Sequence, residues 1–458
     1  MTQQFDAMIV GAGQAGPSLA VRLANAGRKV ALVERHLLGG TCVNTGCTPT
    51  KALVASAYAA HIAKRGVDFG VRTGPVTVDM HAVKARMDAI VTKSRTGLER
   101  WLQSTPNCTV VRGQAKFVGS HAIEVGDEVF EAPQIFLNVG ARPAIPAMPG
   151  VDTVPFLTST GILALEELPR HLVVVGGGYV GLEFAQIFRR FGSQVTVIEQ
   201  HGRLANHEDE DASAGIREIF AGEGIDVRVN AKCIHLEQRG DGVSVGLECN
   251  EGAPHIEGSH VLLAVGRVPN TADLNLAVAG VEADNEGFIR VNDELQTTTP
   301  GVYALGDCNG HGAFTHTSYN DYEIVADNLV NGATRKVSDR IPTYAIYIDP
   351  PMARVGISEA DVRKSGKPAL MGMRPMKRVS RAIEKGETAG FIKVLVDEET
   401  KQILGAMVFG VGGDEAIHCI LTAMYARQPA TLLTHSVHIH PTVAELIPTV
   451  FGELKPLR

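Results

Sequence analysis

Short apolar runs alternate with glycine turns and helical stretches at the start of the chain. The run "FDAMIV" predicts a buried parallel strand, because nearly every position in it is apolar. "GAGQAG" follows as a turn, and "PSLAVRLANAG" predicts a helix with Pro17 near its start and Gly27 at its end. "KVALVE" predicts the next strand, which ends at Glu34. The first residues therefore read as strand, glycine turn, helix and strand.

The same order returns downstream in "HLVVVGGGYVGLEFAQIFRRFGSQVTVIE", from His171 to Glu199. This internal repeat of one supersecondary unit predicts two separate dinucleotide-binding folds in one chain. Between the repeats, a helical stretch from about Ala52 to Gln103 precedes a segment of alternating strands and turns.

Strands return in "HVLLAVGRVPN" and "TTTPGVYALGDC", and the pattern after about Lys336 indicates an antiparallel sheet with helices. The predicted fold class is α/β: two Rossmann-like dinucleotide-binding domains and a C-terminal α+β domain. Pro143, Pro146 and Pro149 mark a boundary. The expected domains are 1–150, 151–265, a central segment 266–335 that returns to the first domain, and 336–458.

The first glycine fingerprint is Gly11-x-Gly13-x-x-Gly16, with Glu34 placed 18 positions after the last glycine. The three glycines suit a tight turn, a close approach of backbone to a pyrophosphate, and close packing of helix on strand. Glu34 can accept hydrogen bonds from a ribose diol. The alternative, an ordinary glycine turn, explains neither the strand and helix around it nor the acid.

The second fingerprint is Gly176-x-Gly178-x-x-Gly181, with Glu199 in the acidic position. A glutamate there suits a free 2′-hydroxyl and repels a 2′-phosphate, so NADH is favoured over NADPH, although His201 and Arg203 nearby could soften the preference. A nicotinamide site implies a hydride, and the other dinucleotide is then most simply a flavin, FAD.

The composition excludes several classes of protein. The formal net charge of −7 argues against nucleic acid as a partner. No apolar run is long enough for a membrane span, and the N-terminus has no basic region of the kind that begins a signal peptide. We therefore expect a cytoplasmic enzyme, in a compartment where disulfides are catalytic or redox-sensing.

Two of the seven cysteines are close neighbours, in "GGTCVNTGCTPTK" from Gly39 to Lys51. The other single cysteines considered are predicted to be buried, inert thiols: Cys108, Cys233, Cys249 and Cys419. Cys42 and Cys47 could form a structural disulfide, part of a metal site, or a redox pair. A metal site would need further soft ligands nearby and a reducing compartment disfavours a structural disulfide, so a redox disulfide is favoured.

The cysteine segment, the two fingerprints and "TTTPGVYALGDC" together resemble the pyridine nucleotide–disulfide oxidoreductases of the glutathione reductase, lipoamide dehydrogenase and mercuric reductase group. The resemblance covers essentially the whole chain. It implies an FAD domain, an NAD(P) domain, a central segment that completes the flavin site, and a C-terminal dimerisation domain.

The resemblance also implies roles for single residues. Cys47 would be the thiolate facing the flavin, Cys42 the thiol that meets the acceptor, and Lys51 a cation at the flavin edge, paired with Glu183. Without the resemblance, Glu183 would read as a solvated helix charge. Asp307 would bind the ribityl chain, and Tyr179 would cover the nicotinamide pocket. Further contacts to FAD are expected from Thr41, Ala115 and Gly306, and to NAD(P) from Gly266.

The C-terminal "HSVHIHPTVAELIP" supplies His440 and, five residues on, Glu445. A histidine bonded to a carboxylate is a tuned general acid–base. The resemblance places this pair in the partner subunit's active site, which makes a homodimer obligatory. His435, His438 and His440 also allow a metal site, with His438 and His440 on one face of a strand, but no carboxylate or cysteine completes the set, so we expect no metal. The His440–Pro441 bond is a candidate cis peptide.

The acceptor is less well defined by the sequence. "GDC" and "TYAIYIDPPMARVGIS" look nearer to the mercuric reductases and the reactive-chlorine-resistance reductases than to glutathione reductase. However, the chain ends "FGELKPLR", without the terminal cysteine pair of mercuric reductases. Three hypotheses stay open: a reductase of a disulfide or thiol-reactive oxidant, a mercuric or copper ion reductase, and a component of a larger complex of the dihydrolipoamide dehydrogenase type. A non-catalytic flavin-binding module would leave the cysteine pair without a purpose.

Overall fold

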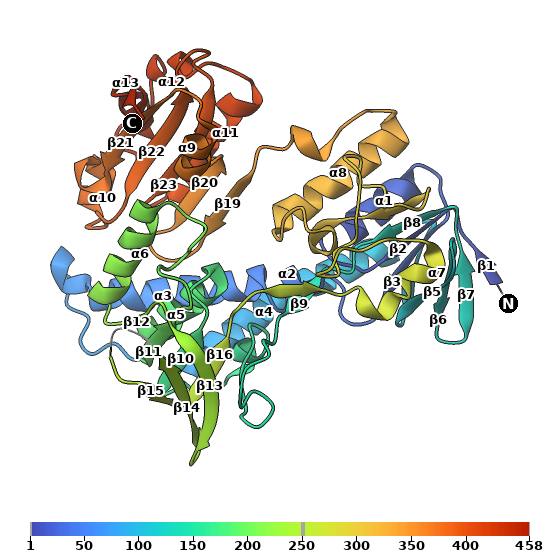
Figure 1. The fold of residues 1–458 in the computed structure, drawn as a ribbon, viewed down its shortest axis with the longest axis horizontal. Coiled ribbons are helices and arrows are strands. Elements are labelled where there is room, and N and C mark those ends of the chain that lie inside the picture. Colours follow the sequence, from blue (N-terminus) through green and yellow to red (C-terminus); the bar gives the residue numbers. More distant parts are fainter. Residues whose placement is uncertain (1, 249–251, 458) are drawn as a thin grey trace.

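The computed structural model describes residues 2–248 and 252–457. A five-stranded parallel sheet forms the centre of the first dinucleotide-binding fold, in the order β18-β8-β2-β3-β4. Its strands are β2 (Ala7–Val10), β3 (Val30–Glu34), β4 (Cys108–Arg112), β8 (Gln134–Leu137) and β18 (Val302–Ala304). Helices α1 (Gly16–Asn25) and α8 (Thr315–Asn331) pack against each other beside this sheet (Figure 1). Residues near 302 thus complete a sheet that begins at residue 7.

A four-stranded parallel sheet, in the order β12-β11-β10-β16, forms the second dinucleotide-binding fold. Its elements are β10 (His171–Val175), α5 (Tyr179–Phe191), β11 (Gln194–Ile198), α6 (Glu210–Gly222), β12 (Asp226–Arg228) and β16 (His260–Leu263). An antiparallel sheet of β13 (Lys232–Arg239), β14 (Gly242–Glu248) and β15 (His255–Gly258) lies against it. β10 and β11 are buried along most of their length, as their apolar runs predict.

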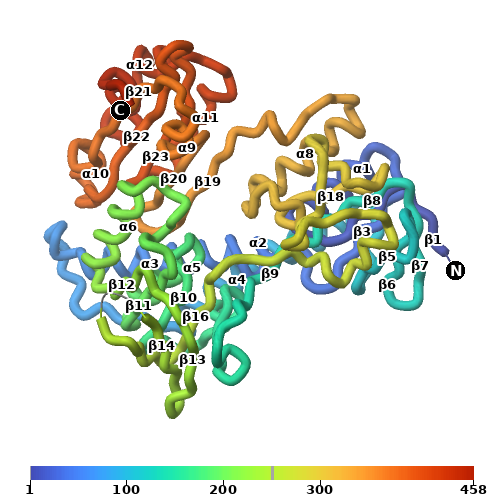
Figure 2. The backbone as a smooth tube through the Cα atoms, in the orientation of Figure 1, coloured from blue at the N-terminus to red at the C-terminus, as the bar shows by residue number. Residues whose placement is uncertain are grey.

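Two short strands connect the folds. β9 (Ala141–Pro143) pairs antiparallel with β17 (Arg267–Pro269), so the chain leaves and re-enters the first fold at one place. Figure 2 shows this connection between the two lobes of the molecule. A further small sheet, with the order β1-β7-β6-β5, flanks the first fold. Its strands are β1 (Thr2–Gln4), β5 (Ala115–Gly119), β6 (Ala122–Val125) and β7 (Glu128–Glu131).

The C-terminal region is an antiparallel sheet of six strands, as the sequence predicts. Its order is β19-β20-β23-β22-β21-β24. The strands are β19 (Thr343–Ile346), β20 (Met352–Gly356), β21 (Ala369–Pro375), β22 (Phe391–Asp397), β23 (Ile403–Phe409) and β24 (Lys455–Pro456). The helices are α9 (Glu359–Ser365), α10 (Ser380–Glu384), α11 (Gly413–Tyr425), α12 (Thr431–Thr434) and α13 (Ile447–Gly452), and α11 packs on β20 and β23.

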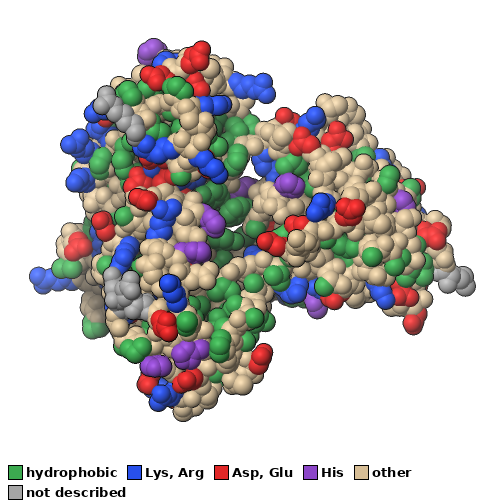
Figure 3. Space-filling view, in the orientation of Figure 1, with side chains coloured by type: hydrophobic (Ala, Val, Ile, Leu, Met, Phe, Trp, Pro, Cys, Tyr) green, Lys and Arg blue, Asp and Glu red, His purple; other side chains and the backbone are tan. Residues whose placement is uncertain are grey.

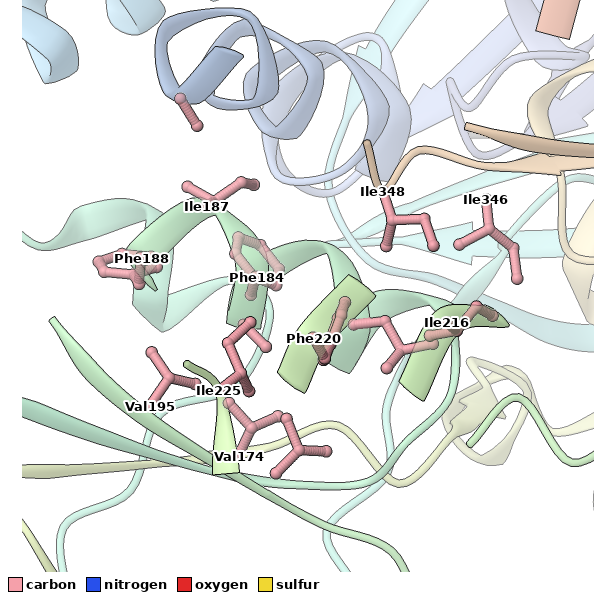
Figure 4. Packing of buried hydrophobic residues seen from close by; sticks show 14 of the residues in the cluster. Val174, Phe184, Ile187, Phe188, Val195, Ile216, Phe220, Ile225, Ile346 and Ile348 are labelled. Atoms are coloured by element: carbon pink, nitrogen blue, oxygen red, sulfur yellow. The ribbon is translucent and has the colours of Figure 1, made fainter. Parts of the chain in front are cut away.

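Two long helices join the lobes. The predicted helical stretch is α3 (Cys47–Lys64) and α4 (Met80–Gln103), preceded by the short helix α2 (Gly40–Asn44). Buried side chains of α3 share one apolar cluster with Phe184 and Phe188 of α5 and with Phe409 of the C-terminal sheet. Figure 4 shows part of this cluster, where Ile346 and Ile348 approach the second dinucleotide fold. The start of α3 is therefore held by packing from three regions of the chain.

The structure corrects the interpretation of the single cysteines in one respect. Cys233 is exposed and has a positive φ of 52°, so it is not a buried thiol. Cys108 and Cys419 are half-buried, and burial raises the pKa of each thiol. Cys249 lies outside the described residues. In the described part of the chain, we find no helix with the length and apolarity that a bilayer crossing requires.

Candidate active site

A cavity of about 800 Å³ contains both the first glycine fingerprint and the cysteine pair. This volume is within the range of pockets that hold cofactors. The space-filling view in Figure 3 shows the molecule hollowed between its lobes. Of the predicted site residues, those that line the cavity are Gly11, Gly13, Glu34, Thr41, Cys42, Cys47, Lys51, Ala115, Tyr179, Glu183 and Asp307. The fold thus brings together residues from four distant segments.

The first fingerprint is shaped for close contact with a ligand. Gly11 has a φ of 101°, and a Cβ atom there would overlap the carbonyl oxygen of Asn138. A Cβ on Gly16 would overlap the carbonyl oxygen of Gly11, which explains the third glycine as a packing requirement. The Gly16 N–H donates to Oδ1 of Asn138 at 3.0 Å. Gly13 lines the cavity, and a Cβ there would lie 2.9 Å from Asn138 Oδ1.

The two acidic residues of the fingerprints occupy matching positions. Glu34 accepts hydrogen bonds from the Ala12 N–H at 2.8 Å and the His36 N–H at 2.7 Å. Glu199 accepts from the Gly177 N–H and the His201 N–H, both at 2.7 Å. Each carboxylate therefore holds its glycine turn in shape, a role that the sequence analysis did not anticipate. Each oxygen keeps a further lone pair for a ribose hydroxyl.

The second fingerprint repeats the backbone geometry of the first. Gly176 has a φ of 116°, and a Cβ on Gly181 would overlap the Gly176 carbonyl oxygen. Around Gly178 and Gly266, whose φ is 131°, nothing lies within 4 Å of an added Cβ. Tyr179 is the first residue of α5, and its ring lies 5.7 Å from that of Phe314 in the cavity wall.

Asp307 lies in the cavity directly after the last strand of the first sheet. Burial raises the pKa of its carboxyl, and Arg267, whose Nη2 lies 3.5 Å away, acts in the opposite direction. Gly306 has a φ of 72°, and its N–H donates to Asp321, which is fully buried. This turn fixes the Asp307 side chain toward the cavity.

The cysteine pair lies where α2 ends and α3 begins. Cys47 is the first residue of α3, and a helix start favours a thiolate through its free N–H groups. Both residues are free thiols, and the hydroxyl of Thr315 lies 2.9 Å from Sγ of Cys42 and 3.2 Å from Sγ of Cys47. A hydrogen bond from the Cys42 thiol is the largest cause that lowers the pKa of Cys47 to about 6, with smaller help from Thr315 and Lys51. The same hydrogen bond, together with burial, raises the pKa of Cys42.

Lys51 and Glu183 form an ion pair beside the cysteines. Lys51 Nζ lies 2.7 Å from Glu183 Oε2 and 4.6 Å from the centre of the Tyr347 ring. The other Glu183 oxygen accepts the Tyr347 N–H at 2.9 Å. Glu183 is only 3 % exposed, so it is not the solvated helix charge that its sequence position alone suggests. Three regions of the chain converge on this pair.

His440 and Glu445 form the expected pair but do not line this chain's cavity. His440 Nδ1 lies 2.7 Å from Glu445 Oε2, and the His440 side chain is 74 % exposed. The neighbouring Val437 and Ile439 are 98 % and 80 % exposed. The His440–Pro441 peptide is cis.

The segment from His435 to His440 is a loop and not the strand that would place His438 and His440 on one face. His438 instead bonds the Ala444 carbonyl through Nδ1. Across residues 2–248 and 252–457, no three histidine, cysteine or acidic side chains converge as ligands for a metal.

Sequence reasoning missed several residues of the site. Asn138, Phe314, Thr315 and Tyr347 all line the cavity. Asn138 carries a weak signal, since it directly follows β8, just before Gly140 in "FLNVGARP". Thr315 is the first residue of α8, after the N-cap position Phe314, and no local pattern points from it to the cysteines.

Family models, relatives of known sequence and solved structures all identify the same family. Residues 5–321 match the family model "Pyridine nucleotide-disulphide oxidoreductase", and residues 342–451 match its dimerisation domain. The probable pyridine nucleotide-disulfide oxidoreductase RclA of Escherichia coli (strain K12) is 35 % identical over 461 residues, which cover 99 % of this chain and 100 % of the relative. A dihydrolipoyl dehydrogenase of Thermus scotoductus is 35 % identical over 96 % of this chain and 95 % of its own.

A mercuric reductase of Lysinibacillus sphaericus is 31 % identical over 96 % of this chain and 81 % of its own. Among solved structures, the HOCl-induced flavoprotein disulfide reductase RclA from Escherichia coli superposes with a TM-score of 0.89 at 34 % identity, covering 98 % of this chain and 99 % of that one. A Cu(II) complex of RclA gives a TM-score of 0.90 with the same coverage and identity. The chain therefore belongs to the pyridine nucleotide-disulphide oxidoreductases, enzymes that use FAD and NAD(P)H.

Proposed function

We propose that this enzyme passes electrons from NAD(P)H through FAD to the Cys42–Cys47 pair, and on to a disulfide or a thiol-reactive oxidant. One observation carries the proposal: the cysteine pair and the first glycine fingerprint line the same cavity. A redox disulfide and a dinucleotide could thus meet there without movement of the chain.

The cavity suits FAD. The bare glycine backbone at Gly11 and Gly13 would hold the pyrophosphate, Glu34 the ribose, and Asp307 the ribityl chain. Thr41 and Ala115 would contact the rest of the cofactor, and Gly306 would turn the chain for Asp307. Bound FAD would supply the exchange of a hydride for the two electrons that reduce a disulfide.

The charges around the thiols support their proposed roles. Cys47 holds a thiolate at neutral pH, because its pKa is lowered to about 6. Cys42 keeps its proton and is the thiol that would attack an acceptor after losing it. Lys51, held by Glu183, keeps a positive charge beside both sulfur atoms.

We propose NADH as the preferred reductant. The second fingerprint, Gly176, Gly178 and Gly181, with Tyr179 and Gly266 beside it, would hold the nicotinamide dinucleotide. The Glu199 carboxylate accepts two backbone N–H groups and is thereby fixed as an acceptor for a 2′-hydroxyl. A ratio of kcat/KM for NADPH over NADH above one would refute this preference.

We propose that the active site is completed by a second copy of the chain. The hydrogen-bonded His440–Glu445 pair is suited to proton transfer but lies outside the cavity of its own chain. A homodimer would bring the partner's pair to Cys42, and the match to the dimerisation domain supports this assembly.

Copper is the second candidate acceptor, because a solved structure of RclA is a Cu(II) complex. The mercuric reductases and dihydrolipoyl dehydrogenases among the relatives also keep Hg(II) and dihydrolipoamide in the panel of candidates.

The deciding experiment is anaerobic. The holoenzyme is reduced with one equivalent of NADH, and the thiol titre is measured before and after mixing with disulfides, an oxidant, Cu(II) or Hg(II). Two new thiols per subunit that vanish rapidly with a disulfide or oxidant support the proposal. Cys42→Ser has no disulfide to reduce, so it should gain no thiols on adding NADH and should not turn over a disulfide or oxidant. Turnover with a metal ion alone would move the assignment to metal reduction, and no new thiols would refute the electron route.

A further inference from the structure

The Thr315 hydroxyl is within hydrogen-bonding distance of both sulfur atoms of the cysteine pair. The Oγ1 atom lies 2.9 Å from Cys42 Sγ and 3.2 Å from Cys47 Sγ. Thr315 is the first residue of α8, which begins 268 residues after Cys47, so the contact is made by the tertiary fold. A hydroxyl has one proton to donate, so it can donate to only one of the two sulfur atoms at a time.

The cysteines need a donor that can change its partner. During reduction of an acceptor, the negative charge must leave Cys47 and appear on Cys42, because the thiolate is the nucleophile. The hydrogen bond that Cys42 donates to Cys47 opposes this movement, because it raises the pKa of Cys42 and lowers that of Cys47. In this chain, the ionisable neighbours are Lys51 on α3, which favours both thiolates, and Glu183, which opposes the Cys47 thiolate. Tyr179 and Tyr347 are neutral near pH 7, since burial raises the pKa of each.

We propose that Thr315 is a further catalytic residue, whose hydroxyl donates a hydrogen bond to whichever of the two sulfur atoms carries the negative charge. When Cys47 is the thiolate, the hydroxyl donates to Cys47. When the S–H proton of Cys42 passes to Cys47 across the hydrogen bond between them, the hydroxyl turns and donates to Cys42. No atom is oxidised in this step, and the charge moves by one proton transfer.

The step prepares the attack on the acceptor and so rests on the proposed function. With a disulfide, the Cys42 thiolate forms a bond to one acceptor sulfur, and the acceptor's S–S bond breaks. The leaving thiolate takes the proton that Cys47 received from Cys42. Cys47, again a thiolate, then attacks Cys42, forms the intramolecular disulfide and breaks the bond from Cys42 to the acceptor sulfur, and the released thiolate takes its proton from water.

The test measures the reactivity of each sulfur atom in the absence of the other. Full-length holoenzyme with Cys47→Ala leaves only Cys42 of the pair, and holoenzyme with Cys42→Ala leaves only Cys47. In each background, the protein is reduced with a phosphine, and the pH dependence of iodoacetamide alkylation at the remaining thiol is followed by mass spectrometry. Thr315→Val removes the hydroxyl and keeps the shape of the side chain, whereas Thr315→Ser keeps the hydroxyl.

We expect Thr315→Val to slow alkylation at neutral pH by about tenfold in both backgrounds, because one lost hydrogen bond to a thiolate corresponds to about one pKa unit. Thr315→Ser should restore the rate. Slowing in only one background, or in neither, overturns the proposal. If Thr315→Val does not retain FAD, Thr315→Ala is measured in its place, with the same outcomes.

Alkylation needs neither NADH nor an acceptor. The result therefore stands apart from the proposed function, which fails when NADH produces no new thiols.

Discussion

The Lys51 ammonium group lies 2.7 Å from the Glu183 carboxylate, and the two side chains differ sharply in exposure. Lys51 is 33 % exposed and Glu183 is 3 % exposed. The pair therefore joins a buried acid of α5 to a cation that still reaches the cavity. Both charges act on Cys47, Lys51 lowering and Glu183 raising the pKa of its thiol, although the hydrogen bond from Cys42 has the larger effect.

Replacing Lys51 and replacing Glu183 should shift the pKa of Cys47 in opposite directions. Lys51→Met removes an attraction, so the pKa of Cys47 should rise, while Glu183→Gln removes a repulsion, so it should fall. The measurement is the pH dependence of Cys47 alkylation in the reduced enzyme. Shifts of the same sign in both variants would contradict this account.

The two thiols of the unaltered enzyme should also differ in their response to pH. Since the pKa of Cys47 is lowered to about 6, its alkylation should stay near its plateau at neutral pH and fall only as the pH drops through about 6. Cys42, with its raised pKa, should react slowly until the solution is strongly alkaline. In denatured protein, both thiols should titrate together near their ordinary value. A Cys47 rate that keeps rising well above neutral pH in the folded enzyme would be inconsistent with a lowered pKa.

Replacing the last glycine of each fingerprint should abolish a different function. An added Cβ at Gly16 or Gly181 would overlap a backbone carbonyl oxygen that cannot move aside. Gly16→Ala should therefore lose FAD, whereas Gly181→Ala should keep FAD but lose reduction by NADH. The measurements are flavin absorbance of the purified protein and thiols formed on adding NADH.

Gly97→Ala is the matched control for these glycine variants. Gly97 lies within α4 with nothing within 4 Å of an added Cβ, so the change should raise stability by about 0.4–1 kcal/mol and leave both functions intact. Loss of FAD in Gly97→Ala would show that FAD retention does not report on the fingerprint geometry.

The sequence predicts those parts of the site in which one local segment carries the whole signal. The strand, glycine turn and helix of each fingerprint are contiguous, and apolar runs identify the parallel strands. The cysteine pair is also local. Glu183 lies between the two cases. Its place on a helix is predicted locally, but its burial depends on the ion pair with Lys51, which lies 132 positions away.

Contacts between distant segments have no such signal. Thr315 reaches Cys42 across 273 positions and Phe314 reaches Tyr179, yet both side chains have ordinary local sequence. Lys393 lies in the strand "FIKVLVD" and would be expected to point to solvent. It is instead 1 % exposed, because acids from two other elements surround it.

Those acids form a buried ionic cluster between the second dinucleotide fold and the C-terminal sheet. Lys393 Nζ lies 2.8 Å from Asp211, 3.0 Å from Asp209 and 3.0 Å from Glu359. Arg354 bonds Glu208 and Asp209 at 2.8 and 2.9 Å. Two cations thus form ion pairs with four carboxylates at this interface.

Lys393→Met should be strongly destabilising, since it removes a buried cation that bonds three carboxylates, even though Asp209 keeps Arg354 and Glu359 keeps Arg363. The expected loss is about 3–5 kcal/mol, typical of a broken buried ion pair. Arg170→Met is the control, because the Arg170–Asp241 pair is 79 % and 89 % exposed and should contribute under about 1 kcal/mol. Thermal unfolding of both variants measures the difference. Equal midpoints would show that the cluster does not stabilise the interface.

Mixed dimers test whether the His440–Glu445 pair serves the partner's cysteines. Cys42→Ser and His440→Ala should each be inactive as homodimers. In a heterodimer of the two, one active site carries both changes and the other carries neither, so that site regains full function. Random mixing should therefore restore about a quarter of the unaltered activity, given a two-fold dimer in which half of the molecules are mixed. Because the pair lies outside its own chain's cavity, no activity should return if subunits do not exchange.

Mixing Cys42→Ser with Cys47→Ala is the control, because both changes fall within the cysteine pair of one chain and each heterodimer site still lacks a cysteine. No activity in the first mixture after exchange is verified would show that His440 does not serve the partner's cysteines, and activity in the control would show that the mixing assay does not report on complete sites.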